Sequence, residues 1–165
     1  MEFTMKSEDL VTVLNAVKGT FGSSDFPALN NIYFKVDANG NGTAISSNGH
    51  EHTHYKFLAR VTTDGEALLD GFLLSKLAPT FASGDIVIKL DGFSADVIHP
   101  SGEVEVLGQD PNDFPQITGI TEESSFMIPA EDLRKIFDSV AFARNKDSQA
   151  NPKLQGLAIV TENGK

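Results

Sequence analysis

Three stretches of the chain carry hydrophobic residues at every third or fourth position, the spacing that places side chains on one face of a helix. The first stretch follows Ser7, a candidate N-cap, and has Glu8 and Asp9 in its first turn, where the helix dipole favours acidic residues. The third starts after Pro129 and again has an acidic first turn. We expect each apolar set to be the buried face of a helix. The sets are Leu10, Val13, Leu14 and Val17, then Leu73, Leu74, Leu77 and Phe81, then Leu133, Ile136, Phe137 and Val140.

Alternation of apolar and polar residues predicts strands around these helices. Dipeptides such as Asn39-Gly40 and Asp91-Gly92 fall between the strands and are typical of tight hairpin turns, so neighbouring strands should be antiparallel. The order strand, helix, three strands occurs twice, which predicts an α+β fold of duplicated βαβββ halves with two helices packed on antiparallel sheet. The predicted strands cover residues 2–5, 29–37, 43–47, 55–61, 66–69, 86–90, 93–98, 103–107 and 154–160.

The chain also repeats its own opening. The segment from Phe3 to Val17 returns between Phe126 and Val140, at an offset of 123 residues. The identical pairs are Phe3/Phe126, Glu8/Glu131, Asp9/Asp132, Leu10/Leu133 and Val17/Val140. A repeat this long is a domain and not a short solenoid unit. We therefore expect a complete first domain at residues 1–118, ending in an extended Pro-rich linker at 110–118, and the beginning of a second copy at residues 119–165.

Composition limits the possible functions. The net charge of −10 argues against nucleic-acid binding by general electrostatic attraction, because such binding depends on neutralising phosphates. The absence of cysteine excludes disulfides and thiolate zinc sites. No apolar run is long enough to span a membrane, and the first residues lack the pattern of a secretory signal, so we expect a cytoplasmic protein with no membrane partner.

A histidine-rich segment formally matches a zinc-protease motif. His50, Glu51 and His54 give H-E-x-x-H, which binds zinc only on a helix, where the two histidines share one face. Here a period-2 pattern follows, so we expect a strand on which His50, His52 and His54 share a face and Glu51 points away. The three histidines are the only candidate metal ligands, and a zinc hydrolase is a remote alternative. The favoured interpretation is a polar strand with no metal.

No other signal indicates catalysis or a cofactor. The acidic pairs at the two helix starts are better explained by the helix dipole than by acid–base chemistry. The loop Asn39–Gly42 lacks the Lys-Ser/Thr of a phosphate-binding loop. Basic residues lie on or just after the helices, at Lys18, Lys76, Arg134, Lys135, Arg144 and Lys146. Taken alone, these are ordinary solvent-exposed residues.

Five segments together resemble the bacterial beta sliding clamp, the processivity subunit of DNA polymerase III, and the similarity extends over the whole chain. The stretch from Leu107 to Ile117 is similar to the clamp's interdomain segment, G-x-D-x-x-x-[FY]-P. The other segments are Phe3–Leu10, Phe26–Ile32, Ile128–Leu133 and the run Pro152-x-Leu154-x-Gly156. The resemblance implies a non-catalytic subunit with three domain copies. Two such subunits close head-to-tail as a homodimer ring around double-stranded DNA, with helices lining the hole.

Enclosure would reconcile an acidic chain with a DNA function, because a closed ring needs only weak, sequence-independent phosphate contacts. The resemblance implies that the DNA-facing residues are Lys18, Lys76, Arg134, Arg144, Asn145, Lys146 and Gln149. The matching loop at residues 20–25 carries no basic residue. Leu154 alone matches the groove that binds the polymerase catalytic subunit and the clamp loader, and the rest of that groove would follow Lys165.

Two departures from the clamp pattern lead to further expectations. Basic residues are sparse, so an alternative function is a clamp-fold protein-interaction module without DNA loading. The chain holds one domain and about a third of another, so we expect it to be a fragment that closes no ring by itself. Its partial second copy would expose Leu133, Phe137 and Leu154 unless another chain or the first domain covers them.

Overall fold

The computed structural model describes residues 1–22, 26–115, 127–144 and 156–160. The chain separates into two compact units, Met1–Thr118 and Gly119–Lys165, and each is described here by itself. Among the described residues, every helix is too short or too polar to cross a membrane.

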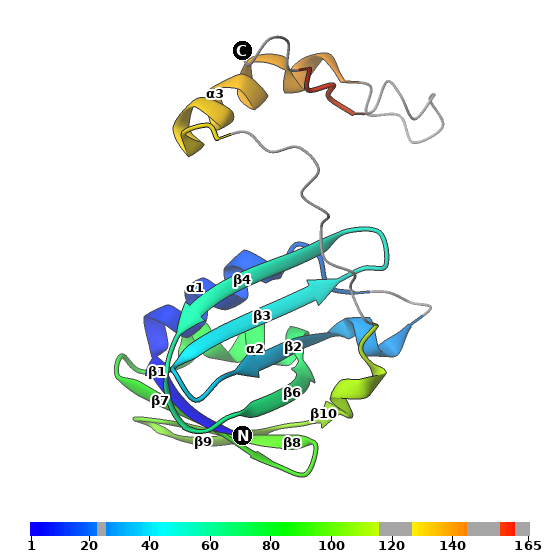
Figure 1. The fold of residues 1–165 in the computed structure, drawn as a ribbon. Helices are drawn as coiled ribbons and strands as arrows, with labels where there is room; N and C mark the ends of the chain where they lie inside the picture. The colour runs from blue at the N-terminus through cyan, green and yellow to red at the C-terminus, as the bar shows by residue number, and fades with distance from the viewer. Residues whose placement is uncertain (23–25, 116–126, 145–155, 161–165) are drawn as a thin grey trace. The chain divides into compact units, whose positions relative to one another are not determined.

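Unit 1 contains ten strands, two α-helices and three short 3₁₀ turns within its described residues (Figure 1). Their order is β1 (Glu2–Lys6), α1 (Ser7–Val17), η1 (Pro27–Asn30), β2 (Asn31–Val36), β3 (Asn41–Ser47), β4 (His52–Leu58), β5 (Arg60–Thr63), β6 (Gly65–Asp70), α2 (Gly71–Leu77), η2 (Ala78–Thr80), β7 (Asp85–Asp91), β8 (Ser94–His99), β9 (Gly102–Val106), β10 (Gly108–Gln109) and η3 (Pro111–Asp113).

The strands form two antiparallel five-stranded sheets, which we call the first sheet (β5-β1-β7-β8-β9) and the second sheet (β10-β6-β2-β3-β4). The two sheets have the same strand order once each strand of the first half, β1–β5, is exchanged with its equivalent in the second half, β6–β10. In this alignment α1 is equivalent to α2. Each half therefore places its first strand in the sheet built mainly by the other half. This arrangement confirms the predicted α+β fold of duplicated halves.

One apolar core joins both sheets and both helices. Phe3 of β1, Leu10 of α1 and Leu74 of α2 are fully buried in it, together with Phe34 of β2 and Ile88 of β7. The helical stripe predicted for α1 is entirely buried, since Val13, Leu14 and Val17 also belong to this core. Both helices and both sheets contribute residues to this one core. The buried apolar residues are therefore distributed along residues 3–106.

The predicted strand at residues 55–61 is instead two strands in two sheets. β4 pairs with β3 in the second sheet, whereas β5 pairs with β1 in the first. The chain crosses between the sheets at Ala59, whose backbone N–H donates to the carbonyl of Gly40 at 2.9 Å. The alternating pattern continues through the crossing because both sheets face the same core, so the sequence alone gives no sign of the break.

The predicted extended linker at residues 110–118 was wrong for its first half. Residues Pro111–Asp113 form the turn η3, and Phe114 is only 8% exposed. Phe114 packs with Leu29 and Leu68 in a small second cluster on the outer face of the second sheet, away from the main core. The segment is therefore part of unit 1 as far as Pro115.

Unit 2 has one helix, α3 (Ala130–Val140), followed by the turn η4 (Ala141–Ala143), among its described residues. The expectation of a buried apolar stripe was wrong: Ile136 is 51% exposed, Phe137 38% and Val140 42%. The predicted strand at 154–160 is absent from residues 157–160, and residues 154 and 155 lie outside the described part of the chain. No sheet is present in the described residues of this unit, so none of its described strands covers the apolar stripe of α3.

Candidate nucleic-acid interface

The surface that carries the unit-1 candidates for DNA contact is the exposed side of the helix pair α1 and α2 (Figure 1). The helices run antiparallel. Phe21, just after α1, meets Phe72 at the start of α2 with ring centroids 4.8 Å apart in an edge-to-face arrangement. At the other end, Glu8 in the first turn of α1 lines a shallow groove with Pro79, just after α2.

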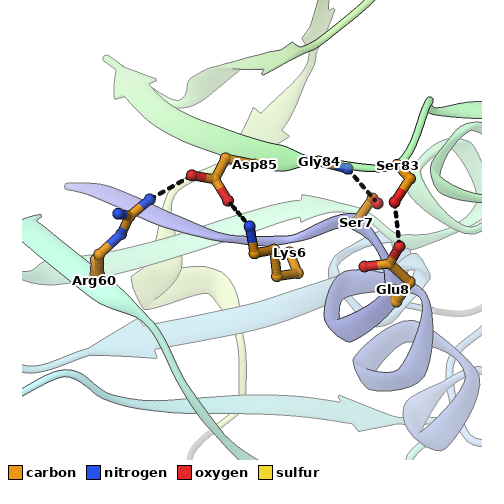
Figure 2. Close-up of polar contacts among 7 residues, drawn as sticks. All are labelled: Lys6, Ser7, Glu8, Arg60, Ser83, Gly84 and Asp85. Atoms are coloured by element: carbon orange, nitrogen blue, oxygen red, sulfur yellow. Dashed lines mark hydrogen bonds and ion pairs between the residues drawn. The ribbon is translucent and has the colours of Figure 1, made fainter.

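Contacts with the start of β7 hold the beginning of α1 in place (Figure 2). The backbone N–H of Ser7 donates to the carbonyl of Gly84 at 2.9 Å, and the N–H of Gly84 donates back to the Ser7 hydroxyl at 3.3 Å. Lys6 is the N-cap, and no side chain caps this helix. The prediction that Ser7 is the N-cap was therefore wrong, because its hydroxyl accepts a bond from a distant segment instead.

Two cations near this end of α1 are engaged by one carboxylate. Asp85 forms ion pairs of 2.6 Å with Lys6 and with Arg60, so it joins β1, β5 and β7 (Figure 2). The Lys6 ammonium, followed by the Arg60 guanidinium, holds the pKa of Asp85 below its ordinary value. Asp85 offsets one of these two positive charges, so the group of Lys6, Arg60 and Asp85 keeps a net charge of +1.

Lys18 ends α1 as its C-cap, and its backbone N–H donates to the carbonyl of Leu14 at 2.9 Å. Its ammonium donates to the Asn15 side-chain carbonyl at 2.9 Å and stays exposed. A cation at this position is favoured by the helix dipole, whatever else it contacts. Lys76 is exposed in the last turn of α2, at the opposite end of the helix pair.

Acidic residues on the same helix pair offset these two lysines. Glu8 and Asp9 are exposed in the first turn of α1. The Ser83 hydroxyl donates to Glu8 and, as the largest cause, lowers the pKa of that carboxyl, so Glu8 is charged at neutral pH. The helix surface of unit 1 is therefore close to neutral, whereas the chain as a whole carries −10.

The remaining candidates belong to unit 2. Arg134 is exposed on α3, and Arg144 is exposed after η4. Lys135 is paired within its own helix with Glu131 at 3.1 Å and Asp132 at 3.6 Å. Asn145, Lys146, Gln149 and Leu154 lie outside the described residues. The structure thus brings Lys18 and Lys76 onto one helix pair and leaves the other candidates on a separate unit.

The histidine segment does not form a zinc site. His50 lies in a turn, while His52 and His54 are exposed on strand β4. The ring of His52 is 2.8 Å from the Ser47 hydroxyl, and Glu51 is hydrogen-bonded to Asn48. The described residues contain no group of three or more acidic or histidine side chains that could hold a metal ion. The remote alternative of a zinc hydrolase fails because the helix that the motif requires is replaced by a turn and a strand.

Sequence reasoning missed a cavity on the outer face of the second sheet. It is lined by strand residues Tyr33, His54 and Glu66 and by Asn112 and Phe114 from the segment predicted as a linker. The signal was present in Asp110-Pro-Asn-Asp, since Asp, Pro and Asn are strong turn formers. The following phenylalanine could have indicated that this turn packs against the sheet.

Comparison with known proteins identifies the fold. No family model and no curated protein sequence matches the chain. Solved structures of bacterial DNA polymerase III beta subunits do match, including the one from Pseudomonas aeruginosa, with a TM-score of 0.82 and 20% identity over 90% of this chain and 41% of that one. The Bartonella birtlesii sliding clamp bound to griselimycin gives 0.83 and 17% over 90% and 40%. The Helicobacter pylori beta clamp bound to a DNA ligase peptide gives 0.80 and 14% over 91% and 42%.

These identities are low, so the likeness establishes the fold of the chain: it has the architecture of bacterial beta sliding clamps, as the sequence resemblance implied. The chain spans about two-fifths of the length of those clamps, 41% for the P. aeruginosa protein.

Proposed function

From this fold, we propose that the chain forms part of a DNA sliding clamp, a processivity factor that encloses duplex DNA and tethers a replicative polymerase without catalysing a reaction. The observation that carries the proposal is the close match of backbone over nine-tenths of the chain, at TM-scores of 0.80 to 0.83, to bacterial beta clamps. In this proposal residues 1–118 are the first clamp domain, and residues 119–165 begin the second.

The proposed mechanism is enclosure with weak contact. The helix pair α1 and α2 would face the DNA with Lys18 and Lys76, joined by Arg134, Arg144, Asn145, Lys146 and Gln149 of the second domain. A nearly neutral helix surface suits a sliding protein, because strong phosphate contacts would hold the ring at one place. The acidic remainder of the chain would face away from the DNA. No base is read, so binding is independent of sequence.

The proposed partners follow from the same assignment. They are double-stranded DNA, a second subunit in a head-to-tail homodimer, and the polymerase catalytic subunit and clamp loader in the cytoplasm. Leu154 would contribute to the groove that receives the protein partners. The H. pylori clamp bound to a DNA ligase peptide supports a protein-binding groove in proteins of this fold.

Retention on nicked circular DNA tests the proposal. The whole clamp of which this chain is proposed to be a part is loaded on a nicked plasmid by its clamp loader and ATP and separated from free protein by gel filtration. We expect it to remain with the circle and to be lost when a restriction enzyme linearises the plasmid, because a ring slides off free ends. Equal retention on circular and linear plasmid would exclude enclosure.

A second candidate is a clamp-fold module that binds proteins but does not load on DNA. The observation in its favour is the balance of Glu8 and Asp9 against Lys18 and Lys76 on the helix pair. This candidate predicts no retention on either form of the plasmid while partner binding is preserved. A double variant, Lys18→Ala with Lys76→Ala, distinguishes the two, since it shortens the lifetime on circular DNA only if those lysines face the duplex.

A further inference from the structure

The cavity on the outer face of the second sheet has a volume of about 330 Å³, at the lower end of the sizes that hold small ligands or single long side chains. Its floor is a row of neighbouring residues across three strands: Tyr33 of β2 pairs with Ile45 of β3, which pairs with His54 of β4. Its wall is the segment after β10, with Asn112 and Phe114 facing the floor.

The wall is held firmly against the sheet. The Phe114 ring stacks on the Tyr33 ring with centroids 5.5 Å apart and planes inclined by 22°. The Asp110 carboxylate accepts hydrogen bonds from the backbone N–H of Asn112 at 2.9 Å and from its side-chain amide at 2.8 Å. These bonds fix the turn, so the site is already formed before a ligand arrives. Binding would therefore cost little conformational entropy.

Three polar side chains around the cavity, Tyr33, Glu66 and Asn112, have oxygen atoms that can accept hydrogen bonds. The Tyr33 hydroxyl donates to Glu66, and burial followed by this bond raises the pKa of Tyr33 far above its ordinary value, so it stays protonated. Lys35 donates to Glu66 at 2.8 Å and fills one further lone pair of that carboxylate. The Asn112 amide donates to Asp110, which leaves its side-chain carbonyl as an acceptor.

We propose that this cavity binds an arginine side chain presented by an extended peptide segment of another protein. A guanidinium offers five N–H donors and no acceptor, which matches acceptors on Glu66, Tyr33 and Asn112. Its flat face can stack on the aromatic pair, which a lysine ammonium cannot do in the same way. Pro111 and Pro115 border the cavity and give the flanking peptide residues an apolar surface. The charge of −10 attracts such a cationic partner from a distance.

The inference goes beyond the proposed function, because it concerns the outer face of unit 1 and requires neither DNA nor a closed ring. A negative result for peptide binding would not change the result expected from the retention experiment on nicked circular DNA. Fluorescence anisotropy of a labelled peptide, Gly-Pro-Ala-Arg-Pro-Ala, titrated with the whole chain is the direct test. We expect saturable binding below about 1 mM, and binding at least tenfold weaker when citrulline, the neutral isostere, replaces arginine.

Two protein variants of equal charge change locate the site. Glu66→Gln keeps the size and one side-chain oxygen that can accept from Lys35 but removes the carboxylate charge, and it should weaken binding at least tenfold. Glu103→Gln removes an exposed carboxylate from β9 in the first sheet and should leave binding unchanged. Absence of saturable binding, equal binding of the citrulline peptide, or equal effects of the two variants would each overturn the proposal. The citrulline comparison uses the unaltered protein, so it holds even if a variant folds poorly.

Discussion

At the scale of single residues, the backbone is closely packed at Gly108, where the chain leaves the first sheet and joins the edge of the second. A Cβ atom at this position would lie 2.3 Å from the backbone oxygens of both Leu68 and Phe93. The first belongs to strand β6 and the second to the tight turn between β7 and β8, so neither backbone oxygen can move aside easily. Glycine is required here by close approach of three chain segments and not by an unusual φ angle.

Gly108→Ala should therefore destabilise unit 1 by about 1–3 kcal/mol, the usual cost of forcing extra atoms into a packed region. Urea unfolding followed by far-UV circular dichroism measures the change. Gly19→Ala is the matched control, because no atom lies within 4 Å of a Cβ there, and it should leave the midpoint almost unchanged. Equal midpoints for both variants would show that the backbone around Gly108 adjusts freely.

The charge of the Asp85 carboxylate makes the free energy of unfolding of unit 1 depend on pH. Its folded-state pKa lies below the ordinary 3.8 because of Lys6 first and Arg60 second. A depressed carboxyl pKa contributes stability that is fully present above the ordinary pKa and is lost as pH falls through the folded value. Asp85→Asn should thus lower the urea midpoint at pH 7 by a small amount, since the group is well exposed. The difference from the parent chain should shrink below about pH 4. A difference that persists unchanged at pH 2 would contradict an electrostatic origin.

At the scale of elements, the repeated helices α1 and α3 show that one sequence pattern can have two outcomes. Leu10 and Leu133 occupy equivalent places in the repeat, yet Leu10 is completely buried and Leu133 is partly exposed. The difference comes from the elements within each unit: α1 packs with two sheets of unit 1, whereas the described residues of unit 2 contain no sheet. The spacing of apolar residues predicts which face of a helix can be buried. Whether that face is buried depends on the strands that pack against it.

The pair Leu10→Ala and Leu133→Ala tests this reading. Leu10→Ala should cost about 2–5 kcal/mol, the range for truncating a buried leucine, whereas Leu133→Ala should change the unfolding of unit 1 by less than about 0.5 kcal/mol. Urea titration of both variants under one set of conditions gives the comparison. A large effect of Leu133→Ala would mean that α3 is covered in solution by something the described residues do not include.

Elements fixed by local sequence could be predicted, and those fixed by distant contacts could not. The α1 stripe and the Asn39-Gly40 turn depend on residues close in sequence, and both are where the pattern indicated. The break at Ala59 and the packing of Phe114 against the second sheet depend on partners far along the chain, Gly40 in the first case and Leu29 and Leu68 in the second. For the same reason the sequence identified Lys18 and Lys76 as candidates, but the pairing of Asp85 with Lys6 and Arg60 and the acceptor-lined cavity emerged only from the folded arrangement.

At the scale of the whole molecule, unit 1 contains its own complete core. All the buried hydrophobic residues found in the described chain lie between Phe3 and Phe114. The inter-strand ion pairs Lys6–Asp85 and Lys35–Glu66 also fall within this range. Unit 1 should therefore be stable without unit 2, and its 16 acidic and 7 basic residues give it a charge of −9 out of the chain's −10.

A chain ended after Thr118 should accordingly fold alone. We expect its urea midpoint to equal that of the main transition of the 165-residue chain, because the buried core residues of unit 1 all lie between Phe3 and Phe114. Circular dichroism and sedimentation velocity measured together would check both stability and association. Aggregation of the shortened chain, or a clearly lower midpoint, would show that residues 119–165 contribute to the core.

The exchange of first strands between the halves affects how unit 1 is made. Phe3 of β1 pairs with Ile88 of β7 in the first sheet. Strand β1 therefore cannot form this pairing until residues synthesised much later are available. A nascent chain on the ribosome cannot complete either sheet until β9 has emerged, and neither half is a folding intermediate in its own right. Cutting the turn between β5 and β6 would give two polypeptides that are unfolded apart and mutually dependent. Mixed together, they could regain the native sheets only as an interlocked pair, which is the behaviour required of a split-protein reporter.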